Sequence, residues 1–179
     1  MGKTMGKVSL AGLNDYLRNG TVMSTEQVDE LKSAIISGLH TDIFGQYSGK
    51  LYRGMIVSYE SMQLLGFDPN KVVTGTQNTA QSTYYTKNGY SSWSKNPKIA
   101  KAFAKPESAG GYGVYSGQKR TVKRFGIVME TDASDLLCAD LEQWYNTVDA
   151  QNSNEQEVLT LEDAVPINRI VCVWNEDDM

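Results

Sequence analysis

The chain reads NEQEVLTL over residues 154–161, where a polar segment runs directly into an apolar strand. Two carboxylates, Glu155 and Glu157, stand two positions apart at this junction. Side chains of a strand alternate between its faces, so residues i and i+2 share one face. If strand geometry begins by Glu155, both carboxylates point into one cleft. The alternative is a surface strand with two solvated glutamates and no chemistry.

Length, charge and cysteine content restrict the class of protein. The 179 residues suffice for one domain that buries about two-thirds of the surface exposed by the unfolded chain. With 17 basic and 21 acidic residues, the formal net charge of -4 disfavours a broad phosphate-binding surface. Cys138 and Cys172 lack metal-ligand spacing, and Cys172 stands in an apolar run. This cysteine pattern indicates a protein of the reduced cytoplasm with no metal site. No apolar run approaches the ~20 residues that cross a bilayer, so we expect no membrane partner.

Two helices are predicted before residue 48. The first covers residues 9–19 and ends at Asn19-Gly20, which tolerate a left-handed cap. The second begins with Ser24 and Gln27 as a capping box, and its apolar face carries Val28, Leu31, Ile35 and Leu39. His40 is the only histidine, and we expect it to complement the helix dipole rather than to act as a base.

The rest of the chain is predicted to be rich in strands. A strand over residues 51–57 carries Arg53 and Gly54 in its interior, and a short helix over about residues 58–65 follows it. The polar segment 74–89 and the glycine-bearing segment 105–124 are interpreted as connections. Further strands are expected at residues 125–130, 158–161 and 167–174, with a connection over residues 131–154.

A strand end rich in serine precedes another predicted helix. The sequence Ser92-Trp93-Ser94 comes shortly before Asn96 and Pro97, which suit the N-cap and the first position of a helix. This helix is expected to turn three apolar side chains inward: Ile99, Ala100 and Phe103.

Three motifs now stand in one order: Arg53-Gly54 on a strand, Ser92-Trp93-Ser94 before a helix, and Glu155-Gln156-Glu157 before a strand. This order resembles the arginine, serine-x-serine and glutamate-x-glutamate signature of mono-ADP-ribosyltransferases of the R-S-E class. The resemblance covers about residues 50–174. Because the chain is small and carries no signal peptide, it is most similar to the tailed-phage enzymes, which modify host proteins after infection.

The resemblance implies a role for each motif residue. Breaking the bond between nicotinamide and ribose in NAD develops positive charge on the ribose, and the Glu157 carboxylate would stabilise this charge. Arg53 would bind the phosphates of NAD through its planar guanidinium, and Gly54 would bring the backbone close to the nicotinamide amide. Ser92 would orient Glu157 through a hydrogen bond, and Ser94 would help to define the same pocket.

Each of these residues also has a purely structural interpretation. Arg53 would then form a salt bridge at a strand end, Gly54 would make a bulge in the strand, and the serines would lead into the helix. Trp93 stands where many family members have threonine, so it is either a packing anchor or a wall of the site.

Glu155 decides the acceptor chemistry under this resemblance. Family members with glutamate at this position generally modify arginine. The guanidinium stays protonated at neutral pH, so it needs a carboxylate to align it and to take its proton. Trp144 and Tyr145 are candidate contacts of the acceptor, or core aromatics. The segment 105–124 matches the family's phosphate-nicotinamide loop in position, and three of its residues are candidate NAD contacts: Tyr112, Tyr115 and Arg120.

The resemblance implies an α+β fold with a split two-sheet antiparallel core around an NAD cleft and N-terminal helices beside it. We expect a single domain over residues 1–179, with an N-terminal helical part (1–48) and an NAD-binding catalytic core (49–179). The implied activity is transfer of ADP-ribose from NAD to arginine side chains of a target protein in the bacterial cytoplasm. Three alternatives remain open: an RNA acceptor, NAD glycohydrolase activity, and an inactive relative that serves as a protein-binding module.

Overall fold

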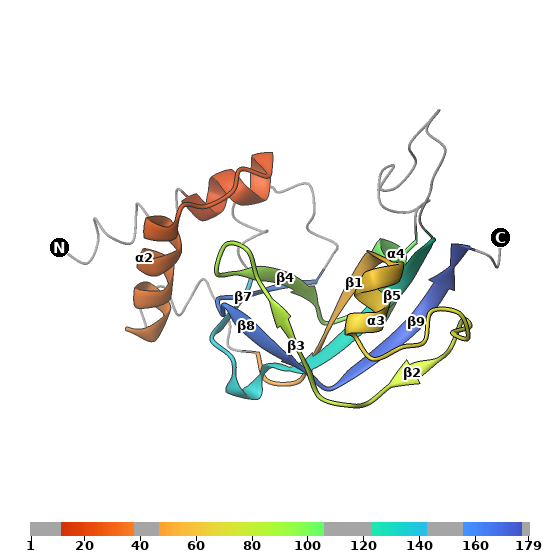
Figure 1. Ribbon diagram of the computed structural model, residues 1–179. Helices are drawn as coiled ribbons and strands as arrows, with labels where there is room; N and C mark the ends of the chain where they lie inside the picture. Colours follow the sequence, from red (N-terminus) through yellow and green to blue (C-terminus); the bar gives the residue numbers. More distant parts are fainter. Residues whose placement is uncertain (1–11, 38–46, 106–122, 143–155, 177–179) are drawn as a thin grey trace. The chain divides into compact units, whose positions relative to one another are not determined.

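The computed structural model (Figure 1) describes residues 12–37, 47–105, 123–142 and 156–176. By its internal contacts the chain divides into two compact units. The first unit contains Met1–Gly49, Tyr84–Lys95 and Asp132–Val165, and the second contains Lys50–Thr83, Asn96–Thr131 and Pro166–Met179. Each unit therefore combines segments that are distant in the sequence.

Two helix ends of the first unit match the sequence prediction. Helical residues 12–19 stop at Gly20, whose φ of 68° is left-handed and whose N–H donates to the Tyr16 carbonyl. Helix α2 (Thr25–Ile36) has Ser24 as its N-cap, and both hydrogen bonds of the predicted capping box with Gln27 are present. Local sequence chemistry thus sets the C-terminal end of the first helix and the N-terminal end of α2.

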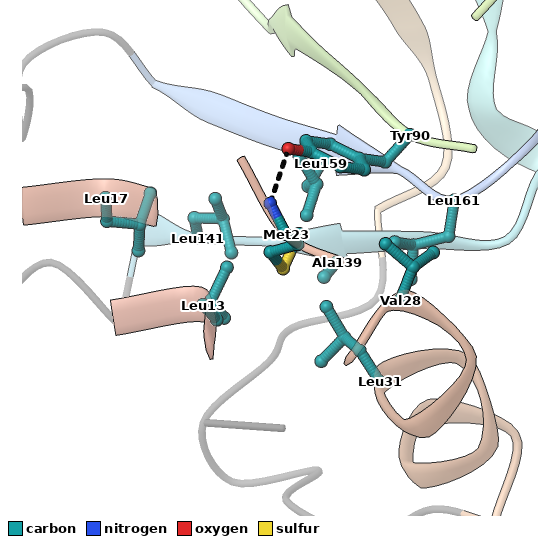
Figure 2. Packing of buried hydrophobic residues seen from close by; sticks show 10 residues of the cluster. All are labelled: Leu13, Leu17, Met23, Val28, Leu31, Tyr90, Ala139, Leu141, Leu159 and Leu161. Atoms are coloured by element: carbon teal, nitrogen blue, oxygen red, sulfur yellow. Dashed lines mark hydrogen bonds between the residues drawn. The ribbon is translucent and has the colours of Figure 1, made fainter. Parts of the chain in front are cut away.

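A hydrophobic cluster joins these helices to strands of the same unit (Figure 2). Leu13 and Leu17 come from the first helix, and Val28 and Leu31 come from α2. They pack with Met23, Tyr90, Ala139, Leu141, Leu159 and Leu161. The Met23 N–H donates to the Tyr90 hydroxyl at 3.1 Å within this cluster, so the one polar group drawn there has a partner.

Three strands of the first unit lie in the order β4-β7-β6 and are antiparallel. Their bounds are β4 (Ser91–Ser94), β7 (Glu157–Thr160) and β6 (Cys138–Asp140), and η1 (Ala133–Asp135) precedes β6. All four residues of β7 are buried, because it lies between two neighbours. The predicted strand at 158–161 is confirmed, shifted by one residue so that it begins at Glu157.

The second unit contains strands in the order β2-β9-β5-β1. They are β2 (Gln77–Asn78), β9 (Arg169–Asn175), β5 (Arg124–Asp132) and β1 (Lys50–Ser58). Helix α3 (Tyr59–Leu64) follows β1 with Ser58 as N-cap, and α4 (Pro97–Phe103) has Asn96 as N-cap and Pro97 at its start. The predicted start of α4 is therefore confirmed.

Two glycines allow α4 to approach its strands closely. A Cβ atom built on Gly54 of β1 would lie 1.7 Å from the Ala100 carbonyl oxygen. One built on Gly126 of β5 would lie 1.9 Å from the Ala104 carbonyl oxygen. Any side chain at Gly54 would collide with the backbone of α4, so this glycine has a packing role that its sequence context did not indicate.

Four local predictions are wrong. The segment 74–89 is not only a connection, because it contains β2 and β3 (Ser82–Tyr85), whose polar residues hide the strand pattern. The predicted connection 131–154 contains η1 and β6. The expected strand over 167–174 is divided: β8 (Ala164–Ile167) ends where it should begin, and β9 starts at Arg169. Phe103 is not turned inward, since 41% of its surface is exposed.

The predicted α+β class is confirmed, with antiparallel sheets and few helices in the described residues. Besides the strands above, β3 and β8 form a two-stranded sheet. The chain passes from the first unit to the second at Gly49, close to the predicted boundary at residue 48. The first unit also takes strands from the predicted core, and the single-domain organisation stays a prediction.

Candidate active site

Glu157 is a buried carboxylate at the start of a central strand of the first unit. It is the first residue of β7 and only 6% exposed. In the register of β4 with β7 it lies opposite Ser94, and its carbonyl accepts a hydrogen bond from the Leu141 N–H at 3.0 Å. Burying a charged carboxylate is unfavourable unless hydrogen bonds compensate, so the hydrogen-bond partners of Glu157 decide whether its carboxylate stays charged.

Ser92 supplies one such hydrogen bond. The Ser92 Oγ lies 3.1 Å from Glu157 Oε2 and donates to it. Ser92 is two residues before Ser94, so it stands diagonally across from Glu157 on the same face of β4 and β7. The hydrogen bond expected between Ser92 and Glu157 is therefore present, and the antiparallel register explains it.

The alternation of β4 places Ser91 and Trp93 on the opposite face, where they pack. The Trp93 Nε1–H donates to Ser91 Oγ at 2.8 Å, and the Trp93 ring meets the Tyr84 ring edge to face at 6.2 Å. Ser91 Oγ also hydrogen-bonds to the Thr160 hydroxyl at 2.8 Å. Of the two interpretations of Trp93, the structure supports the packing anchor, since the residue is 2% exposed.

Tyr16 extends the hydrogen-bonded pair to the first helix. Its hydroxyl lies 2.7 Å from Ser92 Oγ, so Tyr16, Ser92 and Glu157 form a continuous chain of contacts. Tyr16 is not among the site residues predicted from the sequence. The available signal was its spacing from Leu13 and Leu17, which places the three side chains on neighbouring positions of the helix.

The residue before Glu157 changes the expected geometry of the two glutamates. Gln156 has a φ of 48°, in the left-handed region, and its carbonyl accepts from the Lys95 N–H at 3.1 Å. Strand geometry therefore begins at Glu157 and not by Glu155, and strand alternation does not relate the two carboxylates. Glu155 itself lies outside the described residues.

Lys95 forms two ion pairs at this end of the sheet. Its Nζ lies 2.6 Å from Asp140 Oδ2 on β6 and 2.9 Å from Glu142 Oε2. It also lies 5.4 Å from the centre of the Tyr47 ring. Burial lowers the pKa of Lys95, but hydrogen bonds and charges of Asp140 and Glu142 raise the pKa by more, so it stays above its ordinary value. Lys95 thus bridges β4 and β6, the two strands that flank β7.

Cys138 lies on β6, the strand that pairs with β7. Burial, with the charges of Asp140 and Glu162, raises the pKa of its thiol. At neutral pH it therefore remains protonated and is a poor nucleophile. Cys172 is fully buried, as its apolar run predicts.

Arg53 and Gly54 lie on β1, which belongs to the second unit. Arg53 is half-buried. That Arg53 and Gly54 contribute to an NAD site together with Glu157 stays a prediction. Among the described residues, no group of three His, Cys, Asp or Glu side chains is placed to hold a metal ion.

Several candidate residues lie outside the described residues, so their roles stay predictions. They are Glu155, His40, the acceptor candidates Trp144 and Tyr145, and the NAD candidates Tyr112, Tyr115 and Arg120. Within the described part of the chain, no helix has the length and apolar character to cross a membrane.

No protein-family model matches the chain, and no curated protein sequence matches it either. Among solved structures, it is similar to a crystal structure of the ADP-ribosyltransferase Vis in complex with the M6 inhibitor. The sequences are 23% identical and the TM-score is 0.38. The match covers 84% of this chain and 55% of that chain, so this chain spans about half the length of the matched protein.

Proposed function

We propose that the protein transfers ADP-ribose from NAD to arginine side chains of a target protein and releases nicotinamide. The observation that carries the proposal is the hydrogen bond of 3.1 Å from Ser92 to the buried carboxylate of Glu157. It joins two of the three motifs of the R-S-E signature, which stand 65 residues apart in the sequence. A serine that only leads into the helix and a solvated surface glutamate, the structural alternatives, would not need this contact.

The position of Glu157 suits stabilisation of a developing cation. When the bond between ribose C1′ and the nicotinamide nitrogen breaks, its electron pair leaves with nicotinamide and positive charge develops on the ribose. A carboxylate held in place before the reaction stabilises this charge without reorganising at the moment of bond breaking. Because water is largely excluded around Glu157, its charge acts more strongly there than in bulk solvent.

The acceptor nitrogen then forms the new bond. An arginine nitrogen bonds to ribose C1′ and loses one proton. This proton carries away the positive charge that developed on the ribose, and nicotinamide leaves as a neutral molecule. Glu155, two residues before Glu157, is the carboxylate that we assign to this proton. Arg53 is assigned to the phosphates of NAD, since its guanidinium pairs with phosphate oxygens through two parallel hydrogen bonds.

The cellular role that fits this activity is that of a phage or toxin-type effector in the bacterial cytoplasm. Its support is the resemblance to the tailed-phage enzymes. The net charge of -4 favours a protein acceptor rather than a nucleic-acid acceptor, because an acidic protein repels a phosphate backbone.

Incubation of the purified protein with NAD labelled in its adenylate phosphate and a bacterial lysate tests the proposal. We expect labelled bands that a protease removes, and mass spectrometry should place the added mass on arginine. Label that a nuclease removes would assign the acceptor to RNA, and free ADP-ribose as the only product would assign the activity to NAD hydrolysis. Unchanged NAD, with wild-type and Glu157→Gln protein alike, would leave the protein-binding module as the remaining function.

A further inference from the structure

We propose that Tyr16 is a positioning residue for Glu157 and acts through Ser92. The inference rests on the proposed function and adds to it a residue of the N-terminal helix, outside the three motifs. The Tyr16 hydroxyl lies 2.7 Å from Ser92 Oγ, which in turn donates to Glu157 Oε2 at 3.1 Å. All three residues belong to the first unit.

The number of protons on each group fixes the direction of these hydrogen bonds. A serine hydroxyl has one proton, and an ionised carboxylate can only accept. When Ser92 gives its proton to the hydrogen bond with Glu157, its oxygen can only accept from Tyr16. The Tyr16 hydroxyl is therefore the donor, and the chain runs from Tyr16 through Ser92 to the Glu157 carboxylate.

Tyr16 can hold Ser92 because its own ring is fixed. The ring meets the Tyr90 ring edge to face, with centres 5.3 Å apart and planes at 83°. Leu13 and Leu17, on the same helix, are buried in the cluster that Figure 2 shows, and Tyr16 packs against that cluster. Tyr16 lies in the last turn of this helix, where the Gly20 N–H donates to the Tyr16 carbonyl.

The consequence for Ser92 is a single hydroxyl orientation. A serine side chain has three staggered rotamers, and its O–H rotates freely when no partner selects a direction. Donation by Tyr16 occupies one acceptor position of Ser92 Oγ and leaves the O–H to point at Glu157. Hydrogen bonds in such a chain also polarise one another, so the bond to the carboxylate is strengthened.

The test is the variant Tyr16→Phe, which keeps the ring and removes the hydroxyl. We expect kcat for nicotinamide release to fall about 3- to 10-fold with the KM for NAD nearly unchanged, because a single neutral hydrogen bond is lost at a distance from the substrate. Tyr90→Phe is the matched control. It removes the hydroxyl of the stacked partner, which accepts from the Met23 N–H, so it should lower Tm while kcat stays within about 2-fold of wild type.

A double-mutant cycle with Ser92→Ala separates action through Ser92 from a general structural effect. Tyr16→Phe should have no further effect on kcat once Ser92 has lost its hydroxyl. An equal fall in kcat in both backgrounds would overturn the inference, as would a wild-type kcat for Tyr16→Phe alone. If wild-type protein releases no nicotinamide, the proposed function fails and the inference fails with it. A normal wild-type rate with an unaffected Tyr16→Phe overturns the inference alone.

Discussion

Ser92 Oγ donates a hydrogen bond to Glu157 Oε2 at 3.1 Å, from one strand of an antiparallel pair to the next. The contact depends on the register in which Ser94 lies opposite Glu157, since this places Ser92 diagonally across the pair. A slip of one residue would turn Ser92 to the opposite face. The register of β4 with β7 is thus the structural basis of the candidate site.

The variant Ser92→Ala should lower kcat for NAD turnover about 10- to 100-fold. A hydrogen bond to a charged group contributes about 1.5–3 kcal/mol, and this amount of lost transition-state stabilisation corresponds to such a factor. The KM for NAD should change much less, because the orientation of Glu157 matters most as charge develops. Steady-state kinetics of nicotinamide release measures both constants.

Ser91→Ala is the control for this variant, on the same strand but the opposite face. It removes the acceptor of the Trp93 Nε1–H and one of the two partners of the Thr160 hydroxyl, so its main effect should be a lower free energy of unfolding. If Ser91→Ala lowered kcat as strongly as Ser92→Ala, the specific hydrogen bond to Glu157 would not explain the loss.

The variant Glu155→Gln should separate the two halves of the reaction. Without the carboxylate assigned to the arginine proton, transfer to protein should be lost, whereas hydrolysis of NAD by water should continue in part. The ratio of labelled protein to free ADP-ribose, measured with one preparation of labelled NAD, reports this change. Equal losses of both products would assign Glu155 to binding of NAD rather than to the acceptor.

The ion pairs of Lys95 predict a stability effect apart from chemistry. Lys95→Met should lower the free energy of unfolding by about 2 kcal/mol, between the values for exposed and buried pairs, because it leaves the Asp140 carboxylate without its cation. The side chains of Lys95 and Asp140 are only 18% and 15% exposed. Lys71→Met is the control, since Lys71 and Asp68 are 85% and 52% exposed, and its effect should stay below about 0.5 kcal/mol. Urea unfolding at neutral pH measures the free energy of unfolding of both variants.

The difference in free energy of unfolding between wild type and Lys95→Met should depend on pH, with a defined sign. The pKa of Lys95 is raised above its ordinary value of 10.5. Its contribution is therefore fully present below pH 10.5 and is lost as the pH rises through the folded-state pKa. The stability difference between wild type and Lys95→Met should shrink at strongly alkaline pH, and a constant difference would show that packing of the alkyl chain causes it.

Local chemistry made much of the fold predictable from the sequence. The capping box of Ser24 with Gln27, the N-cap Asn96 and the left-handed Gly20 depend only on residues close in sequence. The short strands β2, β3 and β6 were not predicted because they span only two to four residues, too few for a periodic pattern. Pro166 lies within β8 and hides that strand.

The candidate site was predictable only where a motif marked it. Ser92 and Glu157 were found through the order of the motifs, and the strand register brings them together. Tyr16 lies 76 residues before Ser92, and Lys95 meets a carboxylate 47 residues away, at Glu142. No local pattern encodes such pairings, because they arise when distant segments pack in one unit.

The most direct test of the account is nicotinamide release by wild-type protein and by Glu157→Gln. The substitution keeps the shape of the side chain and its hydrogen-bonding capacity but removes the negative charge that is assigned to the ribose cation. We predict that it abolishes both transfer and NAD hydrolysis while Tm shows that the variant is folded. A folded Glu157→Gln variant that turns over NAD at the wild-type rate would contradict the assignment of Glu157 as the catalytic carboxylate.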